Sequence, residues 1–205
     1  GGYPVGARTA IQIYETGQCS RTEAERMLAF CNNSGPAFIL GVVGAGVFGN
    51  GMAGLLLYLA HLLASLLVGV LFRFYRPGDG PQTRRNGGPQ FQTASFPKAF
   101  TQSVLGAMQS TLNICAFILF FTVFLRILAH AGILELLGGL LSALLAPLGM
   151  SQTWAERLLT GLVEVSSGMS SLTDGTLSGR LSMAAFMLGW AGVSVHCQVL
   201  AFLGD

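Results

Sequence analysis

The sequence predicts an all-α, polytopic membrane protein with discontinuous helices and two re-entrant segments, and three observations lead to this class. Of its 205 residues, 52% are hydrophobic and only 10% are charged, whereas an ordinary soluble domain has about 25% charged residues. Glycine contributes 28 residues, and membrane helices tolerate glycine because small residues let backbones pack closely. Several windows also reach the roughly 20 apolar residues that a bilayer-spanning helix needs.

Charge and motif content exclude other classes of protein. The 11 Lys plus Arg against 9 Asp plus Glu leave a net charge of +2, which is too low for a nucleic-acid binder. The 4 cysteines show neither a CxxC pair nor a metal-ligand spacing, so we expect no metal site and no cofactor. The sequence has no HExxH, GxSxG or paired aspartates, so we expect no catalytic residues and no enzyme.

Four stretches are long and apolar enough to be predicted spans. They are Met27 to Phe48, Met52 to Phe72, Val104 to Leu125 and Leu181 to Leu203. A fifth stretch, Ile133 to Met150, is short, carries Glu135 and contains Pro147. We expect it to lie in the membrane interface, and a spanning orientation stays open.

Two further stretches are too polar or too broken for ordinary spans, and we predict that both are re-entrant. Gly1 to Ile13 contains Pro4 and three glycines, and Leu158 to Leu172 contains Glu164 and a Ser-Ser-Gly-Met-Ser-Ser run. Each is followed by a polar turn and then by an apolar helix that is interrupted near its start. Paired interrupted segments of this kind point to the binding site of a transporter with inverted repeats.

Residues 73–98 form a long polar connection with five basic residues and one acidic residue. The positive-inside rule places such a loop in the cytoplasm, and its Gly/Pro clusters are typical of a linker. We therefore expect a first repeat over 1–72, a basic cytoplasmic linker over 73–98 and a second repeat over 99–205. The two halves are inverted only if 133–150 does not span. Because the chain lacks an initiator Met and ends directly after an apolar run, we expect a fragment truncated at both ends.

The segment Asn32-Asn33-Ser34-Gly35-Pro36 interrupts an apolar span. Proline removes an amide hydrogen and frees carbonyl groups one turn earlier, which a membrane tolerates only beside protein or a water-filled cavity. We interpret the segment as a discontinuous helix whose backbone and side chains contact a polar solute. The alternative is a proline kink that its polar neighbours merely cap.

Glu164 is the one acidic residue of the stretch Leu158 to Leu172. An ionisable group at membrane depth is a functional hypothesis by default, so Glu164 is predicted to bind a coupling cation or proton, or to pair with Arg8. Ser166, Ser167 and Gly168 beside it suit a hairpin tip. The alternative is a shallow segment with a solvated carboxylate.

Other polar residues of the apolar stretches are weaker candidates. His196 is a candidate ligand in the last span, but it does not share a helical face with Ser194 and Gln198. The stripe Gly54, Tyr58, His61, Ser65 and Gly69 and the stripe that contains Gln109 and Asn113 are interpreted mainly as helix-packing seams. Arg126, His130, Glu156 and Arg157 are expected to be interfacial charges at helix ends.

Several motifs resemble those of a known family. They are Gly2-Tyr3-Pro4-Val5-Gly6-Ala7, Cys31-Asn32-Asn33-Ser34-Gly35-Pro36, Phe48-Gly49-Asn50, the Glu164-x-x-x-Gly168 turn and Val195-His196-Cys197-Gln198-Val199. On these motifs the sequence resembles the YlbJ family of sporulation integral membrane proteins, also called stage V sporulation protein V. The resemblance implies gate (nucleoside-recognition) domains similar to those of concentrative nucleoside transporters. It also implies movement of dipicolinic acid, pyridine-2,6-dicarboxylate, from the mother cell across the outer forespore membrane of a spore-forming bacterium.

The motif positions also suggest a substrate site. The positions that map onto the family motifs are Tyr3, Pro4, Asn32, Asn33, Ser34, Glu164 and His196. We expect the N-terminal ends of half-helices near Gly35 and Gly168 to face the carboxylates of the solute, with Arg8 as a counter-charge.

The expected partners are a small anionic solute and the lipid bilayer, with other sporulation membrane proteins and a homo-oligomer also open. A nucleoside-like or ion carrier of the same fold and a non-transporting scaffold of spore maturation remain alternative functions.

Overall fold

The computed structural model describes residues 3–76 and 95–201, and this part of the chain is helical without any strand. Its elements are α1 (Val5–Glu15), α2 (Arg21–Cys31), the π-helix η1 (Ala37–Val47), α3 (Gly51–Phe72), α4 (Phe96–His130), α5 (Ile133–Leu144), the 3-10 turn η2 (Ala146–Leu148), α6 (Gln152–Val163), α7 (Val165–Ser170), α8 (Leu177–Trp190) and α9 (Val193–Ala201). Most of the predicted linker, residues 77–94, lies outside the described residues.

Polar caps fix where several helices begin. At α2, the Ser20 side chain accepts a hydrogen bond from the Glu23 amide, while Glu23 accepts one from the Ser20 amide. At α3, Asn50 accepts hydrogen bonds from the first amides of the helix. These side chains satisfy amide groups that have no partner inside the helix.

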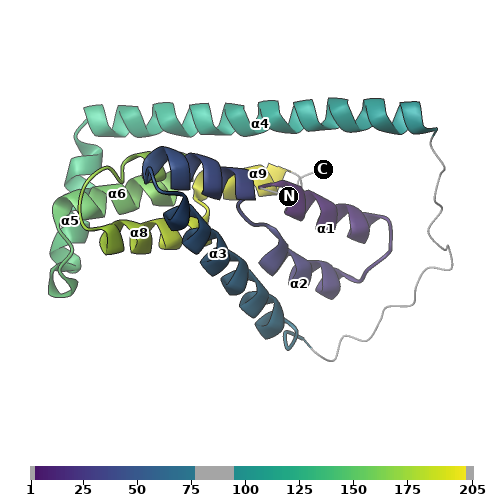
Figure 1. The fold of residues 1–205 in the computed structure, drawn as a ribbon, viewed down its shortest axis with the longest axis horizontal. Coiled ribbons are helices and arrows are strands. Elements are labelled where there is room, and N and C mark those ends of the chain that lie inside the picture. Colours follow the sequence, from purple (N-terminus) through teal and green to yellow (C-terminus); the bar gives the residue numbers. More distant parts are fainter. Residues whose placement is uncertain (1–2, 77–94, 202–205) are drawn as a thin grey trace.

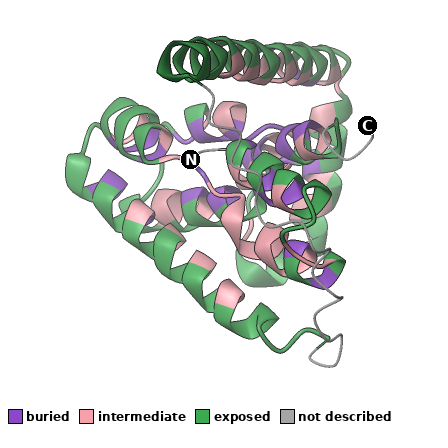
Figure 2. Ribbon diagram, turned by 90° about the vertical axis from the view of Figure 1, so that its right-hand side faces the viewer, coloured by how far each residue is buried: buried purple, intermediate pink, exposed green. Residues whose placement is uncertain are grey.

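Three segments of the described chain are long and apolar enough to cross a membrane. They are α3, α4 and the pair α8–α9, Leu177–Ala201. Many leucine, phenylalanine and valine residues of α3 and α4 are exposed, and both ribbons are largely in the colour of exposed residues (Figure 2). Such a surface is typical of helices that face lipid. The predicted spans 52–72 and 104–125 thus lie within observed helices, and α4 extends beyond its prediction at both ends.

Met27 to Phe48 was expected as a span with a discontinuous helix at Asn32 to Pro36, and the structure has a break at this place. α2 ends at Cys31 and η1 begins only at Ala37, with non-helical backbone between them. η1 has 11 residues, which is too short to cross a bilayer alone. Hydropathy averages over the break, whereas Pro36 and its polar neighbours interrupt the helical hydrogen bonds.

The stretch Leu158 to Leu172 is divided into two helices at Glu164, and the chain turns back only after Ser170. Gly168 was expected at the tip of a hairpin, but the structure does not place it there. It is buried in α7, where a Cβ atom would lie 2.3 Å from the Cα of Gly161. The glycines are needed because two backbones approach each other there.

Each half of the chain contains a hairpin that is followed by a break and by a further helix. In the first half, the hairpin α1–α2 is followed by a break and by η1. In the second half, α7 and α8 form the hairpin, and a break at Ala191 and Gly192, both with positive φ, precedes α9. α5 is a short apolar helix and not a candidate span. The inverted placement of the halves in the membrane stays a prediction.

The core lies where the two halves meet. Ile39 and Val43 of η1 pack in one buried cluster with Met169 of α7 and with Met187 and Leu188 of α8. α4 lies along one side of this assembly and leaves most of its own surface exposed (Figures 1 and 2). The arrangement brings the interrupted segments of both halves together beneath α4.

Candidate functional site

A cavity of about 430 Å³ lies at the junction of the interrupted segments, and we call it the central cavity. Tyr3 lines it ahead of α1, Ser34 lines it from the α2–η1 break, and Glu164 lines it from the α6–α7 break. Gln198 of α9 and Ile118 of α4 complete the wall. Its volume falls in the range of small-molecule sites.

The first break is joined to the second half of the chain. Tyr3 Oη donates a hydrogen bond to the Leu188 carbonyl oxygen of α8 at 2.9 Å. Pro4 is buried behind it and does not line the cavity. Arg8 lies farther along α1, is exposed, and donates to Ser110 Oγ of α4 at 3.2 Å. Arg8 therefore does not supply a counter-charge to the central cavity.

The α2–η1 break is held by polar side chains of α3. Asn33 Nδ2 donates to the Phe30 carbonyl at 2.7 Å and to Ser65 Oγ at 2.8 Å. The Ser34 amide donates to His61 Nε2 at 3.2 Å. His61 and Ser65 thus act as packing and capping residues, as the stripe on this helix predicted. Asn33 acts with them and does not line the cavity.

Two oxygen atoms of the cavity wall are buried without a hydrogen bond of good geometry among the described residues, although the Tyr3 hydroxyl lies close to the Ser34 side chain. They are Ser34 Oγ and Gln198 Oε1, on side chains that are only 4% exposed. Asn32 Oδ1 is also unpartnered, although Asn32 does not line the cavity. Since leaving a buried polar atom unpaired costs about 1–3 kcal/mol, such atoms indicate that the cavity accommodates a polar ligand or water.

Glu164 is the most buried charged residue of the site, with 1% exposure. Its Oε1 accepts from the Ser166 amide at 2.9 Å and its Oε2 accepts from the Ser167 amide at 2.6 Å. The carboxylate thus caps α7. The expectation that the helix end near Gly168 faces a solute carboxylate is wrong, because Glu164 itself occupies that end.

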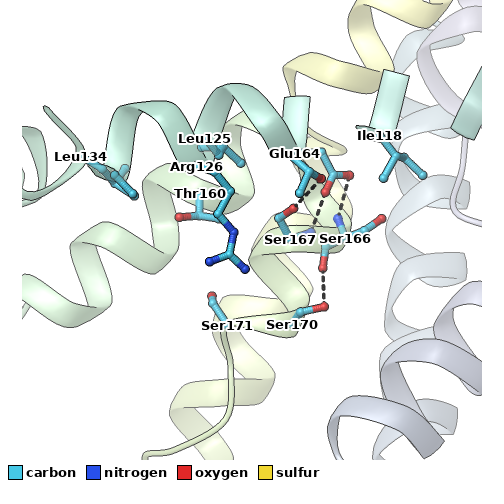
Figure 3. Close-up of a pocket in the computed structure, with 12 residues that line it drawn as sticks. Ile118, Leu125, Arg126, Leu134, Thr160, Glu164, Ser166, Ser167, Ser170 and Ser171 are labelled. Atoms are coloured by element: carbon cyan, nitrogen blue, oxygen red, sulfur yellow. Dashed lines mark hydrogen bonds between the residues drawn. The ribbon is translucent and has the colours of Figure 1, made fainter. Parts of the chain in front are cut away.

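A second cavity of about 550 Å³ adjoins the first, and Ile118, Glu164 and Ser166 line both. We call it the Arg126 cavity, because Arg126 of α4 points into it from one wall (Figure 3). Six residues with hydroxyl groups also line this cavity. They are Thr122, Thr160, Ser166, Ser167, Ser170 and Ser171.

Arg126 was expected to be an interfacial charge, so the sequence interpretation missed its place in the site. A signal was present, because Arg126 follows Ile118 and Thr122 at intervals of four and shares their helical face. Arg157 was also expected at the interface but is buried, and it pairs with Asp174. His196 lies outside both cavities, where it contacts the Gly192 carbonyl and the Trp190 ring.

Within residues 3–76 and 95–201, no group of three or more His, Cys, Asp or Glu side chains could hold a metal ion. No family model matches the chain, and no solved structure gives a significant match.

One curated relative matches the whole chain. It is the sporulation integral membrane protein YlbJ of Bacillus subtilis (strain 168). The two sequences are 30% identical over an alignment of 227 positions, which covers 100% of the chain. The match supports the YlbJ family. It confirms the resemblance seen in the motifs, and it supports an integral membrane protein in a sporulation context. The chain spans 54% of the length of YlbJ.

Proposed function

We propose that the chain forms the solute-binding part of a transporter that moves dipicolinic acid across the outer forespore membrane during sporulation. The observation that supports a transport function is that interrupted segments from both halves meet at the central cavity. Transporters bind solutes at such interrupted helices near the middle of the bilayer. The sporulation context comes from the similarity to YlbJ, and dipicolinate is the solute implied by the family resemblance.

The cavity walls agree with a small aromatic solute. Ile114, Ile118 and Phe38 offer apolar surface, while the Ser34 hydroxyl can donate a hydrogen bond to a carboxylate. Sites for small molecules combine an apolar lining with a few polar groups that orient the ligand. The N-terminal end of η1 at Ala37 also reaches the cavity, and its dipole favours an anion.

The test measures dipicolinic acid in spores of a strain that lacks its own family member. The strain is complemented with the complete protein as wild type, Ser34→Ala or Ser178→Ala. Ser178 is exposed at the start of α8 and outside both cavities, so it is the matched control. We expect restored accumulation for wild type and Ser178→Ala and a clear loss for Ser34→Ala at equal membrane abundance. A well-expressed wild type that restores nothing would refute dipicolinate as the solute.

One observation favours a second candidate, a cation-coupled carrier of an uncharged, nucleoside-like solute. The Glu164 carboxylate and Gln198 Oε1 are both hydrogen-bond acceptors in the wall of the central cavity, and acceptors suit a cation or a ligand rich in donors. Two results together would favour this candidate. The complemented strain would take up uridine in a sodium-dependent way, and the dipicolinic acid content of its spores would equal that of the uncomplemented strain.

A further inference from the structure

We propose that Arg126 binds a carboxylate group of the solute in the Arg126 cavity. The identity of the solute rests on the function proposed above, whereas the anion site itself rests on geometry and charge. The proposed ligand is a small organic carboxylate, and the ring or chain of this ligand extends toward the central cavity.

The inner face of α4 connects the two cavities. Ile114, Ile118, Thr122 and Arg126 follow one another at intervals of four, so they lie along one side of the helix. Ile114 and Ile118 line the central cavity, and Thr122 and Arg126 line the Arg126 cavity. A ligand that extends along this face would contact apolar side chains at one end and a cation at the other.

The Arg126 guanidinium has its donors available. Among the described residues it forms none of the salt bridges, and no hydrogen bond to it is found. Glu164 lines the same cavity, but both of its oxygens already accept amide hydrogens of α7. The planar fork of an arginine binds a carboxylate through two parallel hydrogen bonds, so a carboxylate suits this group in shape and charge.

The hydroxyl groups nearby add donors to the site. Thr122 Oγ1 and Ser167 Oγ lie 3.2 Å apart, and either can donate to the other, which leaves one hydroxyl hydrogen for a ligand. Ser170 and Ser171 instead donate to carbonyl oxygens of their own segment. Arg126 with the Thr122–Ser167 pair therefore forms a donor-rich wall, and Glu164 marks the boundary toward the central cavity.

The test is calorimetric titration of the complete protein in detergent. The probes are pyridine-2,6-dicarboxylate, pyridine-2-carboxylate and the uncharged pyridine-3-carboxamide. The variants are Arg126→Gln, Arg126→Lys and, as the control, Lys98→Gln, which makes the same charge change on an exposed part of α4. We expect Arg126→Gln to raise the Kd of both carboxylates at least tenfold. Arg126→Lys should give an intermediate Kd, because it keeps the charge but loses the fork, and Lys98→Gln should leave the Kd unchanged.

Two results would overturn the site: Arg126→Gln binding both carboxylates as tightly as the wild type, or wild type binding the amide as tightly as the acids. The spore assay separates this failure from failure of the proposed function. If the wild type restores dipicolinic acid accumulation in spores while Arg126→Gln binds the carboxylates with an unchanged Kd, the Arg126 site is refuted and the proposed function is not. Carboxylate binding that depends on Arg126, in a protein that restores no accumulation, supports the site and refutes the function.

Discussion

Gln198 and Ser34 place buried oxygen atoms in a cavity wall without giving them partners. A protein selected only for stability would favour apolar side chains at such positions, because an unpaired buried acceptor is destabilising. Their presence is understandable where a ligand or water completes the hydrogen bonds. The two residues are therefore the places where stability and binding should respond in opposite directions.

Gln198→Met tests this opposition, because methionine has a similar shape and no hydrogen-bonding amide. We expect an unchanged or higher midpoint of thermal unfolding, since the unpaired Oε1 is removed. We also expect a higher Kd for dipicolinate, because the Nε2 group, whose bond to Ser194 Oγ is long at 3.5 Å, can no longer donate to a carboxylate. Fluorescence-detected unfolding and calorimetric titration measure the two quantities. A lower midpoint together with unchanged binding would assign Gln198 a purely structural role.

Asn33→Ala should act on stability rather than on the Kd. Its amide donates to the Phe30 carbonyl and to Ser65 Oγ, so its loss removes both bonds and costs about 1–3 kcal/mol, while Ser65 Oγ still donates to the Phe30 carbonyl. Ser65→Ala should cost a similar amount, because it also removes two of the three bonds and leaves Asn33 donating to the Phe30 carbonyl. The double variant should be less than additive, since the residues share one network. A Kd that rises while the unfolding midpoint stays constant would contradict this assignment.

Sequence reasoning located the α2–η1 break but not the roles of its residues. Ser34 and Gly35 line the cavity, whereas Asn33 turns toward α3. The direction of each side chain depends on the non-helical backbone of the break and on where α3 packs, and neither follows from the order of residues. Arg126 was missed for a different reason. Its spacing with Ile118 and Thr122 was visible, but the inward face of α4 was not.

Among the elements, α6 and α7 pack through glycines rather than through side chains. A Cβ atom on Gly168 would lie 2.3 Å from Gly161 Cα, so Gly168→Ala must push the two helices apart. We expect a loss of folded protein, measured as the monodisperse fraction in detergent. Gly139→Ala on α5 is the matched control, because nothing lies within 4 Å of its added Cβ and alanine favours a helix by about 1 kcal/mol. Equal yields for both variants would contradict the close packing.

The turn between α7 and α8 is held by an ion pair outside the predicted spans. Arg157 of α6 donates to the Asp174 carboxylate and to its backbone carbonyl, and these contacts lower the pKa of Asp174 below its ordinary 3.8. Because the pKa is lower in the folded state, the stabilisation is present above pH 3.8 and is lost as pH falls through the folded value. Asp174→Asn should therefore lower the unfolding midpoint at pH 7, with a smaller difference from wild type at pH 3. A difference that stays constant with pH would exclude the ion pair as the cause.

For single helices, hydropathy predicted α3 and α4 well because each is continuous and apolar. For Met27 to Phe48 hydropathy alone does not show the division into two short helices, which the Asn-Asn-Ser-Gly-Pro segment predicted. The broken segments themselves were recognised from Gly, Pro and Ser content, since these residues interrupt helices whatever the surroundings.

The whole molecule depends on contacts that join the two halves. Arg180 of α8 donates to the Leu172 carbonyl at 2.7 Å and to the Val47 carbonyl at the end of η1 at 3.0 Å. Its guanidinium carbon also lies 4.7 Å from the centre of the Phe48 ring. This single side chain therefore links the α7–α8 turn to the first half.

Arg180→Met should loosen this link while keeping most of the apolar stem. We expect faster amide hydrogen exchange in both η1 and the α7–α8 turn, because each loses a hydrogen bond from the Arg180 guanidinium. Arg21→Met on the exposed surface of α2 is the control. Faster exchange confined to the turn would show that η1 is held by other contacts.

The length of α4 sets a geometric condition on the transport proposed above. Its 35 residues span about 52 Å at 1.5 Å per residue, against a hydrocarbon thickness of about 30 Å. Even at the largest common tilt of about 40°, roughly nine residues project into the aqueous phase. Because one face of this rod closes both cavities, a change in its tilt would open or narrow them together. Bilayer thickness is therefore expected to act on the transport rate through α4.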